Sequence, residues 1–199
     1  MPGTVPTALP AGLELVTDAI TPEQESALLA ACAKFDMRYY EQDPDNPRSR
    51  KQFGWYYDFA TDGFFESSPV PDEFRDVIGL VAKFAGTSPE DIIDTMVIRY
   101  EPGSWIQPHY DKPLFDKIVG LSLASDCEME FSKPEALGGD TVTVTLPRRS
   151  MFKLADDARF VYRHAIPLVT ETRWSMTFRT LTPEGEALRA TFAERRAGQ

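Results

Sequence analysis

The chain has 199 residues, 42% apolar and 12% aromatic residues, and a formal charge of −10 at pH 7. These values are typical of one globular domain that buries a real core. The acidic balance disfavours non-specific adhesion to nucleic acid or anionic lipid, although it leaves room for a local basic groove. No run approaches the roughly 18 apolar residues of a membrane span. Two cysteines, Cys32 and Cys127, are too few for a disulfide framework.

The N-terminal segment and the cysteines indicate the cellular compartment of the protein. Met1 to Ala11 lacks the basic start and apolar stretch of a signal peptide. Both cysteines lie in apolar surroundings, so we expect buried thiols in a reducing compartment. We therefore expect a cytoplasmic protein that is monomeric and does not contact membranes.

The first half of the chain predicts helices, a loop and one aromatic strand. Residues 1–12 are expected to be a flexible tail, and residues 13–199 a single domain. Thr21 and Pro22 predict a helix start, as N-cap and first helical residue. The other elements expected here are a polar loop at Asp43–Arg50, a strand at Phe53–Phe59, a helix at Pro71–Phe84 and a short helix capped at Ser88.

From Thr95 onward the pattern changes to short strands separated by Pro, Gly and Asp clusters. The expected strands are Thr95–Tyr100, Ile118–Ala124, Met129–Phe131, Thr141–Leu146, Met151–Leu154, Phe160–Ile166 and Arg173–Thr180. A charged helix is expected to follow Thr182. Strands at this spacing predict a β-sandwich, jelly roll or barrel, so the fold class is mainly β with flanking helices (α+β).

The two histidines of the chain, His109 and His164, lie in patterns that fit a metal site. His109 and Asp111 are two residues apart, so on a strand both side chains project from the same side. An antiparallel sheet can bring His164 alongside them. Two imidazoles and one carboxylate on one face of an ion, with the other positions open, are the ligands of non-haem Fe(II) oxygenases.

Other interpretations of these residues remain. A His-x-Asp triplet by itself is often a surface pair, and a histidine in an apolar strand is often part of the core. Zinc hydrolysis uses a similar ligand set. It gives no role, however, to the arginine strand that follows.

Arg173 to Arg179 alternates polar and apolar residues with the period of a strand. One face carries Arg173 and Arg179. A guanidinium binds a carboxylate in a bidentate manner, which suits a 2-oxo-acid cosubstrate. A merely solvated strand face is the alternative.

These motifs together resemble the AlkB family of Fe(II)/2-oxoglutarate dioxygenases, from about Phe53 to Thr180. The resemblance rests on Arg99-Tyr100-Glu101-Pro102-Gly103, His109-Tyr110-Asp111, Ile118 to Leu123, Leu146-Pro147-Arg148-Arg149-Ser150, His164 and Arg173 to Arg179. It implies a double-stranded β-helix core with Fe(II) held by His109, Asp111 and His164. It also implies 2-oxoglutarate held by Tyr100, Arg173 and Arg179, with O2 as the second cosubstrate.

The Leu-Pro-Arg-Arg-Ser and Leu-Ser-Leu stretches are most similar to the branch that hydroxylates modified wobble uridines in tRNA. Three features depart from the wider family pattern. Ile98 stands where an asparagine is usual. Lys112 to Leu114 replaces a stretch in which repair members carry a carboxylate. The span from His164 to Arg173 is shorter than in many members that act on nucleic acid.

Candidate substrate contacts combine aromatic and basic residues. Trp55 and Tyr57 follow Arg48, Arg50 and Lys51, and such a mixture fits a nucleic-acid lid as well as an ordinary aromatic strand after a solvated loop. The adjacent pair Arg148 and Arg149 could contact phosphate or end a hairpin. Convergence of these basic residues at the metal site would favour nucleic acid, and their dispersal would count against it.

We therefore expect an Fe(II)/2-oxoglutarate-dependent dioxygenase that hydroxylates or oxidatively demethylates a modified base in nucleic acid, with tRNA preferred over DNA. The alternative is the same oxygenase chemistry on a protein side chain or a small molecule, which the net charge of −10 favours.

Overall fold

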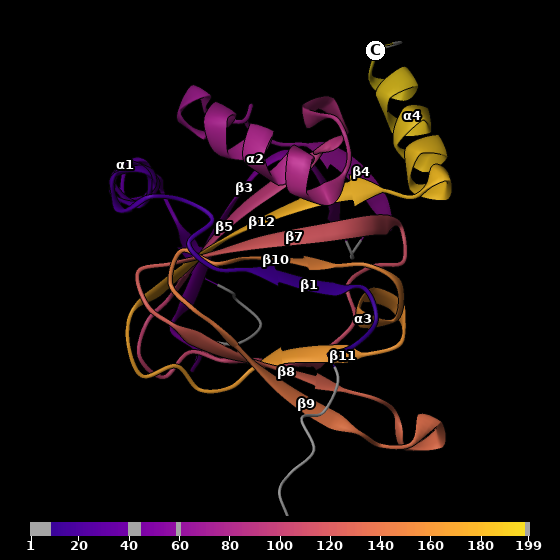
Figure 1. Cartoon of the computed structure of the whole chain (residues 1–199). Helices are drawn as coiled ribbons and strands as arrows, with labels where there is room; N and C mark the ends of the chain where they lie inside the picture. The colour runs from indigo at the N-terminus through magenta and orange to yellow at the C-terminus, as the bar shows by residue number, and fades with distance from the viewer. Residues whose placement is uncertain (1–8, 40–44, 59–60, 198–199) are drawn as a thin grey trace, which may run out of the picture.

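The computed structural model describes residues 9–39, 45–58 and 61–197, which form two antiparallel sheets stacked as layers (Figure 1). The larger sheet has the strand order β1-β10-β7-β12-β5-β3-β2, and β4 pairs with β3. Its strands are β1 (Leu13–Val16), β2 (Arg38–Tyr39), β3 (Arg48–Asp58), β4 (Gly63–Glu66), β5 (Asp94–Tyr100), β7 (Phe115–Leu123), β10 (Met151–Leu154) and β12 (Arg173–Leu181).

The smaller sheet has the order β6-β11-β8-β9. Its strands are β6 (Ile106–His109), β8 (Cys127–Ser132), β9 (Thr141–Leu146) and β11 (Arg163–Ile166). A buried cluster that includes Ile118, Phe131 and Leu154 joins strands of both sheets. The prediction of a mainly β fold with a jelly-roll core is confirmed by this arrangement.

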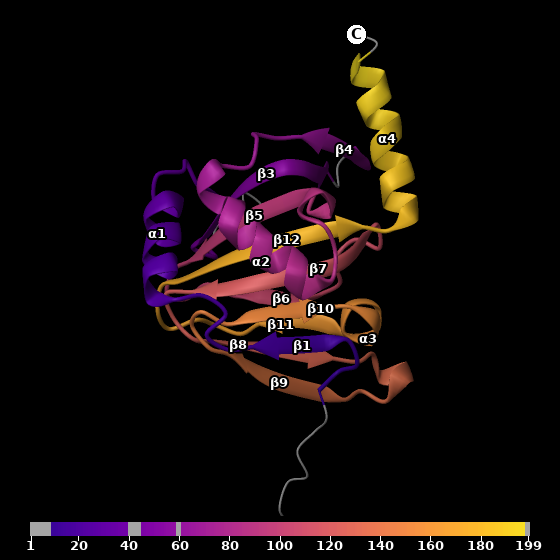
Figure 2. The same cartoon turned by 45° about the horizontal axis from the view of Figure 1, so that its top comes forward.

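Helices cover the outside of the larger sheet (Figure 2). These are α1 (Pro22–Cys32) and α2 (Arg75–Ala85), with short 3-10 turns at Asp72–Phe74 and Pro89–Asp91. A third 3-10 turn, Glu135–Leu137, joins β8 to β9. The predicted cap of α1 is confirmed, because the Thr21 hydroxyl accepts a hydrogen bond from the Gln24 main-chain amide, and the Gln24 side-chain oxygen accepts one from the Thr21 amide.

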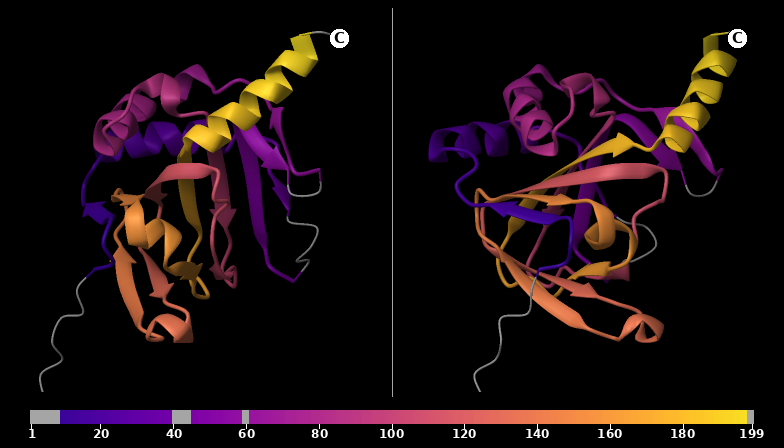
Figure 3. Two further views of the ribbon diagram at one scale, coloured as in Figure 1. Left: turned by 90° about the vertical axis from the view of Figure 1, so that its right-hand side faces the viewer. Right: turned by 45° about the vertical axis from the view of Figure 1, so that its right-hand side comes forward.

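Two further helices lie at the ends of strands. The short helix α3 (Asp156–Phe160) links β10 of the larger sheet to β11 of the smaller one (Figure 3). The C-terminal helix α4 (Pro183–Ala197) follows β12 and contacts β4. No helix within the described residues is both long and apolar enough to cross a membrane.

Some predicted boundaries are wrong for identifiable reasons. Arg48 to Arg50 belongs to β3 rather than to a loop, because this stretch pairs with β5 from Tyr100 to Ile98. Phe160 ends a helix instead of beginning a strand, and β11 starts only at Arg163. The expected loop residues 43 and 44 and the expected strand end, Phe59, lie outside the described residues.

The beginning of the described chain is held more firmly than a tail. Residues 1–8 of the expected tail lie outside the described residues. The carbonyls of Ala11 and Gly12, however, accept hydrogen bonds from the amides of Ala158 and Ala155. These bonds attach the segment before β1 to α3.

The two cysteine thiols are free and buried, as expected. Burial raises the pKa of the Cys32 thiol to about 12, and it also raises the pKa of Cys127. Both thiols are therefore protonated and unreactive at neutral pH.

Candidate metal and cosubstrate site

Three donor side chains meet between the sheets. In the pairing of β6 with β11, His109 lies directly opposite His164, and the two imidazole centroids are 4.3 Å apart. Asp111 lies two residues beyond the end of β6, with its Oδ2 3.4 Å from Nε2 of His164. One donor atom from each of the three residues lies within 4.8 Å of the others. The structure therefore brings together the three residues that the sequence singled out.

The surroundings of the imidazoles suit metal binding. His109 Nδ1 lies 2.9 Å from the Gln107 carbonyl oxygen. With the proton on Nδ1, this contact is a hydrogen bond that orients the ring and leaves the Nε2 lone pair for an ion. His164 is buried, and its Nδ1 has no hydrogen-bond partner among the described residues. Two imidazoles and a carboxylate are a ligand set that fits Fe(II).

The electrostatics favour the protonation states that a metal requires. Burial opposes ionisation of Asp111, but Arg179, with Nη2 3.5 Å from Asp111 Oδ1, and the two histidines outweigh it. The pKa of the Asp111 carboxyl is therefore held well below its ordinary value. Burial and the neighbouring His164 lower the pKa of His109. The result is an ionised carboxylate beside a neutral imidazole.

Arg179 also has a second acidic partner, which sequence reasoning missed. Its Nη1 lies 3.0 Å from Oδ2 of Asp94, and Gln52 Nε2 donates to the same carboxylate at 2.9 and 3.0 Å. Asp94 is fully buried, which raises its pKa despite the nearby guanidinium. Register alone makes this pair, because β12 places Arg179 opposite Asp94 on β5. Arg179 thus links the carboxylate of Asp111 to a buried acid behind it.

A cavity of about 650 Å³ adjoins the three donor residues. Its described lining includes all the predicted metal and cosubstrate residues, namely Tyr100, His109, Asp111, His164, Arg173 and Arg179. Apolar side chains such as Ile118, Met129 and Phe152 complete much of the wall. On β7, a Cβ on Gly120 would overlap the Phe152 ring, so this glycine leaves the ring room to lie against the strand.

Arg173 has the environment of an anion-binding residue. It is 1% exposed, its Nε donates to Ser122 Oγ at 3.2 Å, and its guanidinium lies 5.0 Å from the Tyr100 ring centroid. Among the described residues no carboxylate forms an ion pair with it. A buried guanidinium at a cavity wall without an acidic partner suits an incoming carboxylate.

The predicted substrate residues separate into two groups. Arg50 lines the cavity together with Arg48, Trp105 and Tyr110. The last two were not predicted as substrate contacts. In the sequence, Trp105 was recognisable only as an aromatic residue near the metal motif. In the structure, the buried Asn46 side chain donates to the Trp105 carbonyl and accepts from the Trp105 amide, which fixes the main chain of this residue.

Trp55 and Tyr57, which were predicted as substrate contacts, pack away from the cavity. Both belong to an apolar cluster with Phe64 and residues of α4, and neither is among the described residues that line the cavity. Arg189 lies 5.5 Å from the Trp55 ring. The sequence revealed an aromatic strand but could not show that its later residues face a helix.

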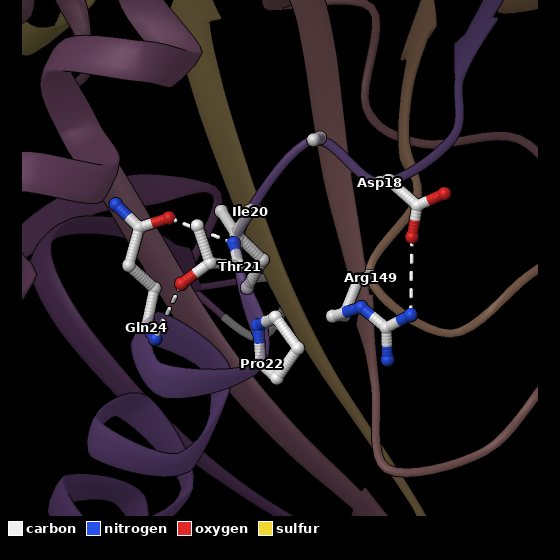
Figure 4. Close-up of a pocket in the computed structure, with 7 residues that line it drawn as sticks. Asp18, Ile20, Thr21, Pro22, Gln24 and Arg149 are labelled. Carbon is white, nitrogen blue, oxygen red and sulfur yellow. Dashed lines mark hydrogen bonds and ion pairs between the residues drawn. The ribbon is translucent and has the colours of Figure 1, made fainter.

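Arg148 and Arg149, also predicted as substrate contacts, form ion pairs with residues outside the cavity lining. Arg148 Nε lies 2.7 Å from Oε2 of Glu25, a fully buried carboxylate on α1. Arg149 Nη2 lies 3.0 Å from Oδ1 of Asp18, beside the start of α1 (Figure 4). These arginines fasten the turn between β9 and β10 to the first helix. Lys51 also lies outside the described lining, so of the five basic residues only Arg48 and Arg50 converge on the cavity.

The chain is similar to known proteins in sequence and in fold. No family model matches the chain. The tRNA (carboxymethyluridine(34)-5-O)-methyltransferase alkbh8 of Xenopus tropicalis is 29% identical over 164 residues, which is 80% of this chain but only 26% of that protein. The chain thus spans about a quarter of the length of this curated relative.

Two solved structures share the fold. The structure of OsALKBH1 superposes with a TM-score of 0.65 at 13% identity, covering 87% of this chain and 98% of that one. An oxidoreductase of the 2OG-Fe(II) oxygenase family from Burkholderia pseudomallei gives a TM-score of 0.61 at 13% identity, covering 85% and 84%. At this identity the likeness concerns the fold.

Proposed function

Because the chain is AlkB-like in sequence and in fold, we propose that it is an Fe(II)- and 2-oxoglutarate-dependent dioxygenase. One observation carries the proposal: donor atoms of His109, Asp111 and His164 lie within 4.8 Å of one another beside a cavity. When bound, ferrous iron would activate O2 and couple decarboxylation of 2-oxoglutarate to oxidation of a substrate C–H bond.

The residues of the chain would divide the work as follows. The Gln107 carbonyl would hold the Nδ1 proton on His109, and Arg179 would keep Asp111 ionised, so that both donors could bind the cation. Arg173 and the Tyr100 hydroxyl would bind the distal carboxylate of 2-oxoglutarate. The apolar wall would exclude water from the reacting atoms.

We propose a modified base in nucleic acid, preferably tRNA, as the substrate. The name of the Xenopus relative refers to a tRNA uridine, and the described residues that line the cavity here include Arg48 and Arg50 together with Trp105 and Tyr110. Since the chain matches a quarter of that relative, the methyl transfer in its name is not carried over. Oxidation would leave a hydroxyl group or, where the carbon is bonded to nitrogen, release formaldehyde.

The same chemistry on a protein side chain or small molecule is the second candidate. The net charge of −10 and the position of Lys51, Arg148 and Arg149 away from the cavity favour it. Both candidates include the cytoplasmic, monomeric state expected from the sequence.

The first experiment tests the metal site. His109→Ala and Asp111→Asn should abolish iron- and 2-oxoglutarate-dependent succinate formation while the circular dichroism spectrum is retained. Asp72→Asn is the matched control, because that carboxylate is 89% exposed in a surface pair with Arg75. Undiminished turnover in the His109 variant would refute the assignment.

The second experiment tests the substrate. Nucleoside mass spectrometry of host tRNA, with and without the gene for this chain, should show one modified base replaced by its unoxidised precursor. Identical profiles, with succinate formation intact, would remove nucleic acid in favour of the second candidate.

A further inference from the structure

The segment that carries Asp111 is not held by strand pairing. Cross-strand pairing of β6 with β11 fixes His109 and His164. Asp111, in contrast, lies between the end of β6 at His109 and the start of β7 at Phe115. We call residues 110–114, together with Phe115 at the start of β7, the ligand loop. Some other contact must fix its main chain if the carboxylate is to meet the imidazoles.

That contact comes from Arg159 on α3. Arg159 is 1% exposed, and its Nη1 donates to the Asp111 carbonyl at 3.3 Å. Its Nη2 donates to the Phe115 carbonyl at 3.0 Å and also to the Lys112 carbonyl. The guanidinium therefore holds the main chain of the ligand loop at three residues, Asp111, Lys112 and Phe115.

The partners of Arg159 are unusual for so deeply buried a cation. No carboxylate in residues 9–39, 45–58 or 61–197 forms an ion pair with it, and all three acceptors are main-chain carbonyls. Burial lowers the pKa of Arg159, although the negative charge of Asp111 opposes this effect. A guanidinium buried at such a cost with its donors aimed at one loop orders that loop.

The same corner of the fold also carries His164. Arg159 lies five residues before His164, at the end of the helix that leads into β11. A second bond joins this corner to the ligand loop, because the Tyr110 hydroxyl donates to the Val161 carbonyl at 3.3 Å. One short segment, residues 159–164, thus sets the position of both Asp111 and His164.

We propose that Arg159 is a positioning residue for the metal carboxylate. It fixes the main chain of the ligand loop, while Arg179 holds the Asp111 side chain from the other side. This inference rests on the proposed function, since it assigns Asp111 to a metal. Arg159 is not among the described residues that line the cavity, so its removal should spare the cosubstrate contacts.

The test compares Arg159→Met and Arg159→Lys with the wild type. Met keeps much of the length without donors, and Lys keeps the charge but not the fork. Co(II) titration of the apoprotein, followed by absorbance, should show about 10- to 100-fold weaker binding for Met, as is typical when a group that orients a ligand is lost. Lys should fall between Met and wild type. Arg75→Met, at a side chain 77% exposed, should bind Co(II) like wild type.

Hydrogen exchange supplies a readout that a merely structural role would not move. In the wild-type apoprotein, the Phe115 amide, which donates to Lys112, should exchange slowly. In the Arg159 variants it should exchange faster, while amides of β12 keep their protection. Rapid exchange of the ligand loop in wild type would overturn the proposal without any variant.

The outcomes separate this inference from the function beneath it. If wild type and His109→Ala bind Co(II) equally, the metal site itself is wrong. If His109→Ala does not bind Co(II) and Arg159→Met binds it as tightly as wild type, the metal site stands and the role of Arg159 fails. A variant that merely melts earlier, with unchanged affinity, also contradicts positioning.

Discussion

Replacement of Arg173 by alanine should raise the 2-oxoglutarate requirement without disturbing the metal site. Arg173 is buried, and the Ser122 hydroxyl and the Tyr100 ring hold its guanidinium at the cavity wall. The cosubstrate carboxylate would therefore meet a donor group that is already oriented. A hydrogen bond to a charged partner is worth about 1.5–3 kcal/mol.

That free energy sets the size of the effect. Because each 1.4 kcal/mol changes an affinity about tenfold, Arg173→Ala should raise the KM for 2-oxoglutarate by about 10- to 100-fold. Arg173→Lys should recover only part of this loss, because an ammonium lacks the planar fork that matches a carboxylate. If binding to the ground state and transition state is lost equally, kcat at saturating cosubstrate changes little.

The assay is succinate formation at varied 2-oxoglutarate, with Arg99→Ala as the matched control. Arg99 precedes Tyr100 on β5, so its side chain lies on the opposite face of the sheet, where it pairs with Glu101 at 2.6 Å and lies over the Trp174 ring. The control should keep the wild-type KM. A KM for Arg173→Ala within about twofold of wild type would refute the role of this residue.

Three further predictions concern the surroundings of the site. Asp94→Asn removes one of the carboxylates that pair with Arg179, so the free energy of unfolding in urea should fall by about 1.5–3 kcal/mol, and a loss below about 0.5 kcal/mol would contradict the importance of the pair. Gly120→Val should push the Phe152 ring into the cavity, raising the KM for 2-oxoglutarate while Co(II) binding is kept; an unchanged KM would show that the ring relaxes elsewhere. Burial raises the pKa of Cys32 from 9.0 to about 12, so the unfolded chain releases this proton first and stability should fall as pH rises from about 9 towards 12. Cys32→Ala should flatten that fall, and identical pH profiles would argue against the raised pKa.

The sequence predicted the donor residues better than their supporting contacts. Residue type and spacing were enough to predict that His109, Asp111 and His164 lie close together. The strands β9 and β10 were also predicted with their observed bounds. Both have hydrophobic patterns bounded by turn residues, which is information local to the chain.

The features that the sequence did not predict depend on strand register and on partners that are distant in the sequence. Arg148 pairs with Glu25, which lies 123 residues away in the sequence. Nothing in the local sequence distinguishes an arginine in such an ion pair from one that contacts a phosphate. Asp94 becomes the partner of Arg179 only once β12 and β5 are aligned. Arg48 to Arg50 has the composition of a loop, yet pairing with β5 makes it a strand, because tertiary context overrides local preference.

The distribution of charge bears directly on the choice of substrate. The chain as a whole carries −10, but the described residues that line the cavity include four arginines and one carboxylate, Asp111. An approaching anion responds to this local field more than to the total charge, since exposed charges beyond about 10 Å are screened by salt. Of those arginines, Arg173 would bind 2-oxoglutarate, and Arg179 pairs with Asp111. The other two, Arg48 and Arg50 on β3, would be the ones that contact the substrate. A basic cavity in a chain of net charge −10 therefore argues against long tracts of bound phosphate, and it is compatible with a single anionic or phosphate-flanked base inserted from a short single-stranded segment.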